Sequence, residues 1–187
     1  MIGMDAEWGL FQRIATAHKF PWAMTLGAIQ DKSLITEMAA KIAEDCKRMG
    51  INWDFAPVVD VNTNPNNPII GNRSFGSAVP NVVSSALAYS NGLQDNNILA
   101  AIKHFPGHGD TDKDSHLDLP VVSHSLKRLT EIEIAPFKAL MDKGIGGVMV
   151  AHLYVPALEK TKGIPASISK NIITGILKEQ LGYKGLI

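Results

Sequence analysis

The sequence has little cysteine, no net charge and no long apolar run, and each shortage excludes a class of protein. Its 187 residues contain one cysteine, so no intramolecular disulfide can form. Lysine and arginine equal aspartate and glutamate at 18 each, so nothing in the charge favours nucleic acid or an acidic membrane surface as a partner. The longest apolar run, 145–153, is strand-sized, and we expect no transmembrane segment.

Common cofactor and metal motifs are also missing. No GxGxxG follows an expected strand, which removes the usual phosphate turn of a dinucleotide-binding sheet. No CxxC or HxxxH spacing falls on a regular element, so we rank a metal site low. The single cysteine, Cys46, lies on the apolar stripe of an expected helix and is interpreted as a small core residue.

What is present is an alternation of short apolar runs with amphipathic segments. We predict strands at 1–4, 23–26, 51–61, 98–105, 147–153 and 185–187. Helices are expected at 33–49, 80–94, 125–144 and 169–181. This alternation is typical of an α/β fold with a parallel sheet. The polar segments follow the strands, as in a (β/α)8 TIM-type barrel, with a doubly wound open sheet as the alternative.

Six expected strands are two fewer than a closed barrel of eight requires. Open apolar strand edges are unfavourable in water. We therefore expect residues 1–187 to form one partial catalytic barrel domain, a truncated barrel that lacks about one strand at each end. If residues 1–187 are part of a longer protein in this way, their sequence does not predict its localisation, its further domains or its oligomeric state.

The stretch 103–120, KHFPGHGDTDKDSHLDLP, is unusually rich in titratable groups. It contains three histidines and four aspartates: His104, His108, His116, Asp110, Asp112, Asp114 and Asp118. Turn chemistry explains the glycines, but it does not require so many titratable side chains. We interpret the stretch as an active-site loop that follows a buried strand, and we rank a metal site below that reading.

The segment 103–116, KHFPGHGDTDKDSH, resembles the signature of glycoside hydrolase family 3, in particular its β-N-acetylglucosaminidase branch. Segments 5–13, 71–76 and 176–187 resemble other parts of that family, in the same order along the chain. The resemblance implies retaining hydrolysis of terminal, non-reducing β-linked N-acetylglucosamine in cell-wall glycans, without a metal or an organic cofactor. Trp8 stands where the family often has glycine, and it either stacks on sugar or fills the core.

The resemblance also implies roles for individual side chains. His116 would be the general acid/base, and Asp114 would hold its tautomer and raise its pKa. Carboxylates accept hydrogen bonds from sugar hydroxyls, and cationic side chains donate to sugar oxygens. The residues implied to bind the sugar are Asp5, Arg13, Arg73, Lys103 and His104.

The family's nucleophile is an aspartate that would follow Ile187, so we expect residues 1–187 alone to be inactive or very weak. A histidine acid/base does not repel an anionic nucleophile, so phosphorolysis is a variant of the expected reaction. Three alternatives stay open. They are another family 3 β-glycosidase such as a β-glucosidase or β-xylosidase, a non-catalytic sugar-binding barrel, and a barrel enzyme that acts on phosphorylated substrates.

Overall fold

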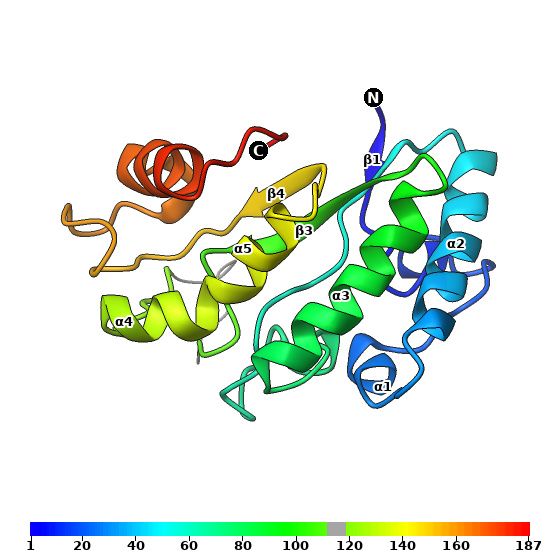
Figure 1. The fold of residues 1–187 in the computed structure, drawn as a ribbon, viewed down its shortest axis with the longest axis horizontal. Helices are drawn as coiled ribbons and strands as arrows, with labels where there is room; N and C mark the ends of the chain where they lie inside the picture. Colours follow the sequence, from blue (N-terminus) through cyan, green and yellow to red (C-terminus); the bar gives the residue numbers. More distant parts are fainter. Residues whose placement is uncertain (112–118) are drawn as a thin grey trace.

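The computed structural model describes residues 1–111 and 119–187, which form a parallel sheet covered by helices (Figure 1). Its four strands are β1 (Gly3–Met4), β2 (Trp53–Asp54), β3 (Leu99–Phe105) and β4 (Gly147–Val150), which lie side by side in chain order. Leu186 adds a parallel bridge to Gly147 of β4. Consecutive order is that of a (β/α) barrel, whereas a doubly wound sheet reverses its order midway. The predicted TIM-barrel-type α/β fold is confirmed.

Helices connect the successive strands and cover the sheet. The α-helices are α1 (Ala23–Gly27), α2 (Ser33–Arg48), α3 (Val79–Gln94), α4 (Leu126–Arg128) and α5 (Ala135–Met141). Three 3-10 helices are η1 (Leu10–Gln12), η2 (Gly71–Arg73) and η4 (Ala166–Ile168) in the described residues. The described π-helices are η3 (Leu129–Glu133) and η5 (Asn171–Gln180). Figure 1 shows α2, α3 and α5 side by side over the sheet, and α3 packs against both of the others. This single outer layer is the helix arrangement of a barrel.

The amphipathic helix α2 illustrates how the sequence pattern builds the core. Ile35, Ala39, Ile42 and Cys46 recur at helical spacing, and all four are fully buried. Burial raises the pKa of the Cys46 thiol to about 12, so this cysteine is a core residue, as predicted, and a poor nucleophile. Within the described ranges, none of the helices has the length and apolar character that a bilayer span requires.

Two strand predictions need correction. Residues 23–26 form helix α1, because alanine, methionine and leucine are strong helix formers and so short an apolar run has no decisive period. The predicted strand at 51–61 is regular only at Trp53–Asp54, and Val58 then makes an isolated bridge to Lys103. Pro57 has no N–H to donate to a ladder between these points. The described sheet therefore has five strand positions rather than six.

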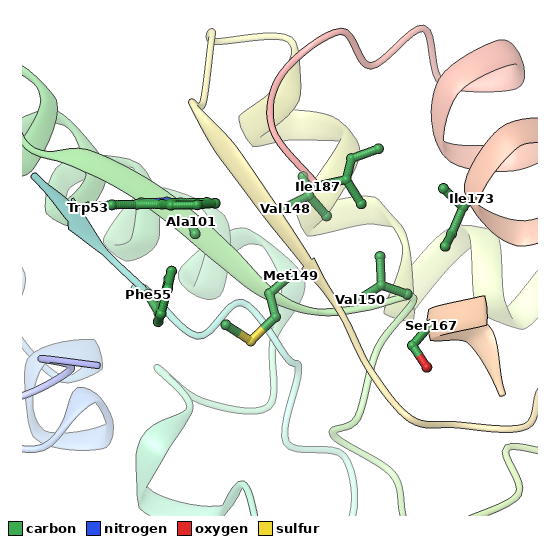
Figure 2. A pocket seen from close by; sticks show the side chains of 9 residues that line it. All are labelled: Trp53, Phe55, Ala101, Val148, Met149, Val150, Ser167, Ile173 and Ile187. Atoms are coloured by element: carbon green, nitrogen blue, oxygen red, sulfur yellow. The ribbon is translucent and has the colours of Figure 1, made fainter. Parts of the chain in front are cut away.

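The strands β2, β3 and β4 also border an apolar cavity of about 470 Å³ (Figure 2). Trp53 and Phe55 meet edge to face there, with ring centroids 5.1 Å apart. No carboxylate, histidine, lysine or arginine is among the described residues that line this cavity. It therefore lacks groups for acid–base chemistry, which gather instead at the carboxyl ends of the strands.

Candidate active site

A second cavity, of about 460 Å³, lies at the carboxyl ends of β1, β3 and β4. Most of the residues that line it are polar or charged, and parallel strands bring distant parts of the chain to this edge. The side chains that the sequence analysis assigned to sugar binding all line it: Asp5, Arg13, Arg73, Lys103 and His104. The structure thus brings together five residues from four separate segments, although their roles stay predictions.

The centre of this site is the buried ammonium group of Lys103. Its Nζ lies 2.8 Å from Asp5 Oδ1 and 2.7 Å from Glu7 Oε1, and only 2% of its side chain is exposed. A buried charge is tolerated when it is paired in this way. Lys103 therefore ties β3 to the segment that follows β1.

Glu7 links Lys103 to Arg73, the last residue of η2. Arg73 donates to both of its carboxylate oxygens, from Nη2 at 2.7 Å and from Nε at 2.9 Å. Burial opposes ionisation of Glu7, but the hydrogen bonds from Arg73 and the charge of Lys103 lower its pKa to about 2. No role for Glu7 was predicted from the sequence. The available signal was its place two residues after Asp5 in the same family-like segment.

Asp5 and Arg13 form the more open side of the site. Asp5 accepts hydrogen bonds from Lys103 and Arg13. Burial opposes ionisation of Asp5, but Lys103 and then Arg13 hold its pKa below the ordinary value. The side chains of Asp5 and Arg13 are 27% and 52% exposed, so both remain accessible to a ligand in the cavity.

His104 is held by the carboxylate of Asp60, for which no role was predicted from the sequence either. Asp60, fully buried, lies 2.7 Å from His104 Nδ1 through Oδ2 and accepts the backbone N–H of His108 at 2.6 Å. Burial opposes ionisation of Asp60, but the contacts with His104 and His108 lower its pKa. Burial lowers the pKa of His104. A neutral His104 then donates from Nδ1 to Asp60 and accepts at Nε2 from Arg73 Nη2, 3.3 Å away.

The loop that follows β3 lies directly against the backbone of residue 61. A Cβ at Gly109 would lie 1.9 Å from the carbonyl oxygen of Val61, so only glycine fits without a shift of the main chain. Next in sequence, Asp110 contacts His124 Nε2. The close approach of Gly109 to Val61 and the contact of Asp110 with His124 therefore fix the start of the loop that follows β3.

Asp110, His124 and Glu133 form a group of three possible metal ligands within the described ranges. Arg128 Nη2 lies among them, 3.1 Å from Glu133 Oε1 and 3.6 Å from Asp110 Oδ2. The guanidinium already supplies positive charge, and a divalent cation would have to displace it. We therefore interpret this group as an ion-pair cluster.

The predicted acid/base pair, His116 and Asp114, falls in 112–118, which lies outside the described residues. Its geometry stays a prediction. Trp8, for which two roles were left open, packs against Trp22 with ring centroids 4.1 Å apart. Trp8 is half-buried and lies outside both the hydrophobic core and the set of residues that line the polar cavity, so neither role is confirmed.

Comparisons with known proteins give the family. The model of the glycosyl hydrolase family 3 N terminal domain matches residues 1–187. Beta-hexosaminidase A of Pseudoalteromonas piscicida is 38% identical over 200 residues, which cover 99% of this chain and 33% of that protein.

Solved structures agree in fold as well as in sequence. One is a glycoside hydrolase family 3 beta-N-acetylglucosaminidase from Paenibacillus sp. str. FPU-7, with a TM-score of 0.92, 42% identity, and coverage of 100% of this chain and 36% of that one. Another is NagZ from Neisseria gonorrhoeae in complex with N-trifluoroacetyl-D-glucosamine, with a TM-score of 0.90, 33% identity, and coverage of 100% and 56%. The chain thus spans between one third and just over half of these proteins. It belongs to glycosyl hydrolase family 3, in the branch of the β-N-acetylhexosaminidases.

Proposed function

We propose that residues 1–187 contribute the sugar-binding wall of the catalytic barrel in an enzyme that hydrolyses terminal, non-reducing β-linked N-acetylglucosamine. The observation that carries the proposal is the polar cavity in which Asp5, Arg13, Arg73, Lys103 and His104 converge. Relatives named as beta-hexosaminidases support the reaction class, and a structure solved with N-trifluoroacetyl-D-glucosamine supports the sugar.

The charge balance of the cavity favours a neutral sugar over a phosphorylated substrate. Each cation there already has a carboxylate partner: Arg13 pairs with Asp5, Arg73 pairs with Glu7, and Lys103 contacts both acids. A phosphate group would compete with these carboxylates for the same donors. Hydroxyl groups can instead add hydrogen bonds to paired groups without separating them.

The proposed mechanism is a double displacement. An aspartate nucleophile, which the family resemblance assigns to a position after Ile187, attacks the anomeric carbon. His116 protonates the leaving oxygen, so that the glycosidic bond breaks and a covalent glycosyl-enzyme forms. His116, oriented by Asp114, then takes a proton from water as the water attacks, and the nucleophile leaves as a carboxylate. Phosphate in place of water would give the sugar 1-phosphate as a variant.

The proposal is tested with the protein encoded by the complete gene. We expect that protein to cleave an aryl N-acetyl-β-glucosaminide in preference to the matched aryl β-glucoside and β-xyloside. We expect His116→Gln to abolish most of this turnover, and residues 1–187 alone to be inactive or very weak. Preference for the glucoside or xyloside would assign the other family 3 β-glycosidases. Sugar binding without any turnover would assign a non-catalytic barrel.

A further inference from the structure

The predicted sugar-binding residues occupy only one side of the polar cavity. Asp5, Arg13, Arg73, Lys103 and His104 come from β1, η1, η2 and β3 and the turns beside them. The β4 side is lined by Met149, Val150, Ala151 and His152. The first three have no polar side chain, and His152 is exposed. A sugar ring carries polar substituents around its whole edge, so the groups that face β4 need a partner there as well.

The position of His152 is fixed by the segment that carries Ser167. Ser167 N donates to Ala151 O at 3.1 Å, and Ala166 N donates to Leu153 O at 2.7 Å. These two backbone bonds lie on either side of His152 in the sequence. They bring Ser167 to the end of β4, where Figure 2 shows it near Val150. Ser167 Oγ then lies 2.6 Å from His152 Nδ1.

The two histidines His104 and His152 differ in the nitrogen atoms that they leave for a ligand. His104 has Asp60 at Nδ1 and Arg73 at Nε2, 3.3 Å away, so a sugar hydroxyl would reach Nε2 only by replacing that longer contact. His152 contacts Ser167 Oγ through Nδ1. A hydroxyl both donates and accepts, so Ser167 suits either tautomer of His152. Nε2 of His152 can therefore serve as a donor or an acceptor for a ligand.

We propose that His152, held by Ser167, hydrogen-bonds a hydroxyl or acetamido group of the sugar from the β4 side and is a specificity-determining residue of this cavity. The inference rests on the proposed function, since it concerns the same site. It adds a contact outside the family-like motifs and assigns Ser167 as the positioning residue.

Paired substitutions in the protein encoded by the complete gene separate the two ring nitrogens. The amide of His152→Asn reaches about as far as Nδ1 and can keep the contact with Ser167, but it offers nothing near Nε2. The amide of His152→Gln reaches further and retains a polar group there. We expect His152→Asn to weaken inhibition by free N-acetylglucosamine, and to lower kcat/KM, by about tenfold or more. We expect His152→Gln to recover part of the loss.

His18→Asn is the matched control, because His18 is an exposed histidine that packs on Phe20 away from the cavity. We expect it to leave both readouts unchanged. The melting temperature of each variant reports whether it folds. If His152→Asn does not fold, Ser167→Ala decides the matter, because it frees the imidazole of His152 and should weaken inhibition several-fold.

The outcomes separate this inference from the function on which it rests. If the wild-type protein binds N-acetylglucosamine and folded His152→Asn, or Ser167→Ala in its place, binds it equally well, the inference is wrong and the proposed function stands. If the wild-type protein shows neither binding nor turnover, the proposed function fails, and the inference fails with it.

Discussion

Replacement of Glu7 by glutamine removes the negative charge that contacts two cations of the site, the buried Lys103 and the half-buried Arg73. Glu7 has 6% of its side chain exposed and contacts both Arg73 and Lys103. Lys103 keeps its second partner, Asp5, at 2.8 Å. Arg73, whose side chain is 22% exposed, is left with a neutral amide in place of a bidentate carboxylate. The main loss therefore falls on Arg73.

The pKa of Glu7 sets the size of the effect. Its fall from 4.5 to about 2 corresponds to about 3 kcal/mol of stabilisation, because one pKa unit is worth about 1.4 kcal/mol. Loss of one partner from a buried ion pair has a similar cost, about 3–5 kcal/mol. A carboxyl whose pKa is lowered by folding stabilises the protein above its unfolded pKa. The contribution of Glu7 is therefore complete above pH 4.5 and disappears as the pH falls through about 2.

Urea denaturation at a series of pH values measures this directly. We expect Glu7→Gln to lower the free energy of unfolding at pH 7 by about 3 kcal/mol, and the difference from wild type to shrink as the pH falls below 4.5. Glu44→Gln is the control, since Glu44 pairs with Lys41 on the surface and its loss should change stability by less than about 1 kcal/mol. A Glu7→Gln effect that is absent at pH 7, or that stays the same at every pH, would refute the reasoning.

Three further substitutions test other parts of the structure. Burial raises the pKa of Asp54 from 3.8 to about 7, so its ionisation destabilises the fold as the pH rises through this range. Asp54→Asn should raise the free energy of unfolding at pH 8 by about 1–3 kcal/mol, after the cost of an unpaired amide, and an unchanged value in urea denaturation would contradict this. Asp60→Asn should shift His104 away from its Nδ1–H tautomer and lower the free energy of unfolding by about 1–3 kcal/mol. The ¹⁵N chemical shifts of the His104 imidazole report the tautomer, and unaltered shifts would contradict this prediction. Gly109→Ala should lower the free energy of unfolding by about 1–3 kcal/mol, because the added Cβ would meet Val61 O. Gly175→Ala, whose Cβ would meet no described atom outside its own helix backbone within 4 Å, should raise it by about 0.5–1 kcal/mol. Equal effects of the two substitutions in thermal melts would be inconsistent with this packing.

The fold was largely predictable because its main elements carry a clear period. The stripe of α2 and the apolar runs of β3 and β4 lie where the sequence pattern predicts them. Residues 23–26 were mistaken for a strand because so short a run, three apolar residues and Thr25, has no distinguishable period. At 51–61 a strand pattern was present, but proline and the path of the chain limited the ladder to two residues.

The candidate site was predictable only where a motif marks it. Asp5, Arg73 and Lys103 lie in segments that resemble a known family, and they meet in one cavity. Glu7 and Asp60 were not assigned, because their partners lie 66 and 44 residues away in the sequence. Such pairings depend on how parallel strands align, and single-sequence periodicity carries no information about that alignment.

The contact between Lys103 and Asp5 spans 98 residues, and this separation has a consequence for biosynthesis. Asp5 and Glu7 leave the ribosome long before Lys103 does, so until β3 is made these carboxylates have only Arg13 and Arg73 as cationic partners. A translation product that stops before β3 lacks both Lys103 and His104. If Lys103 and His104 bind the sugar as proposed, retention of a sugar would report that three successive strands have docked, and a ligand-affinity resin would separate such stalled products from chains that have passed this point.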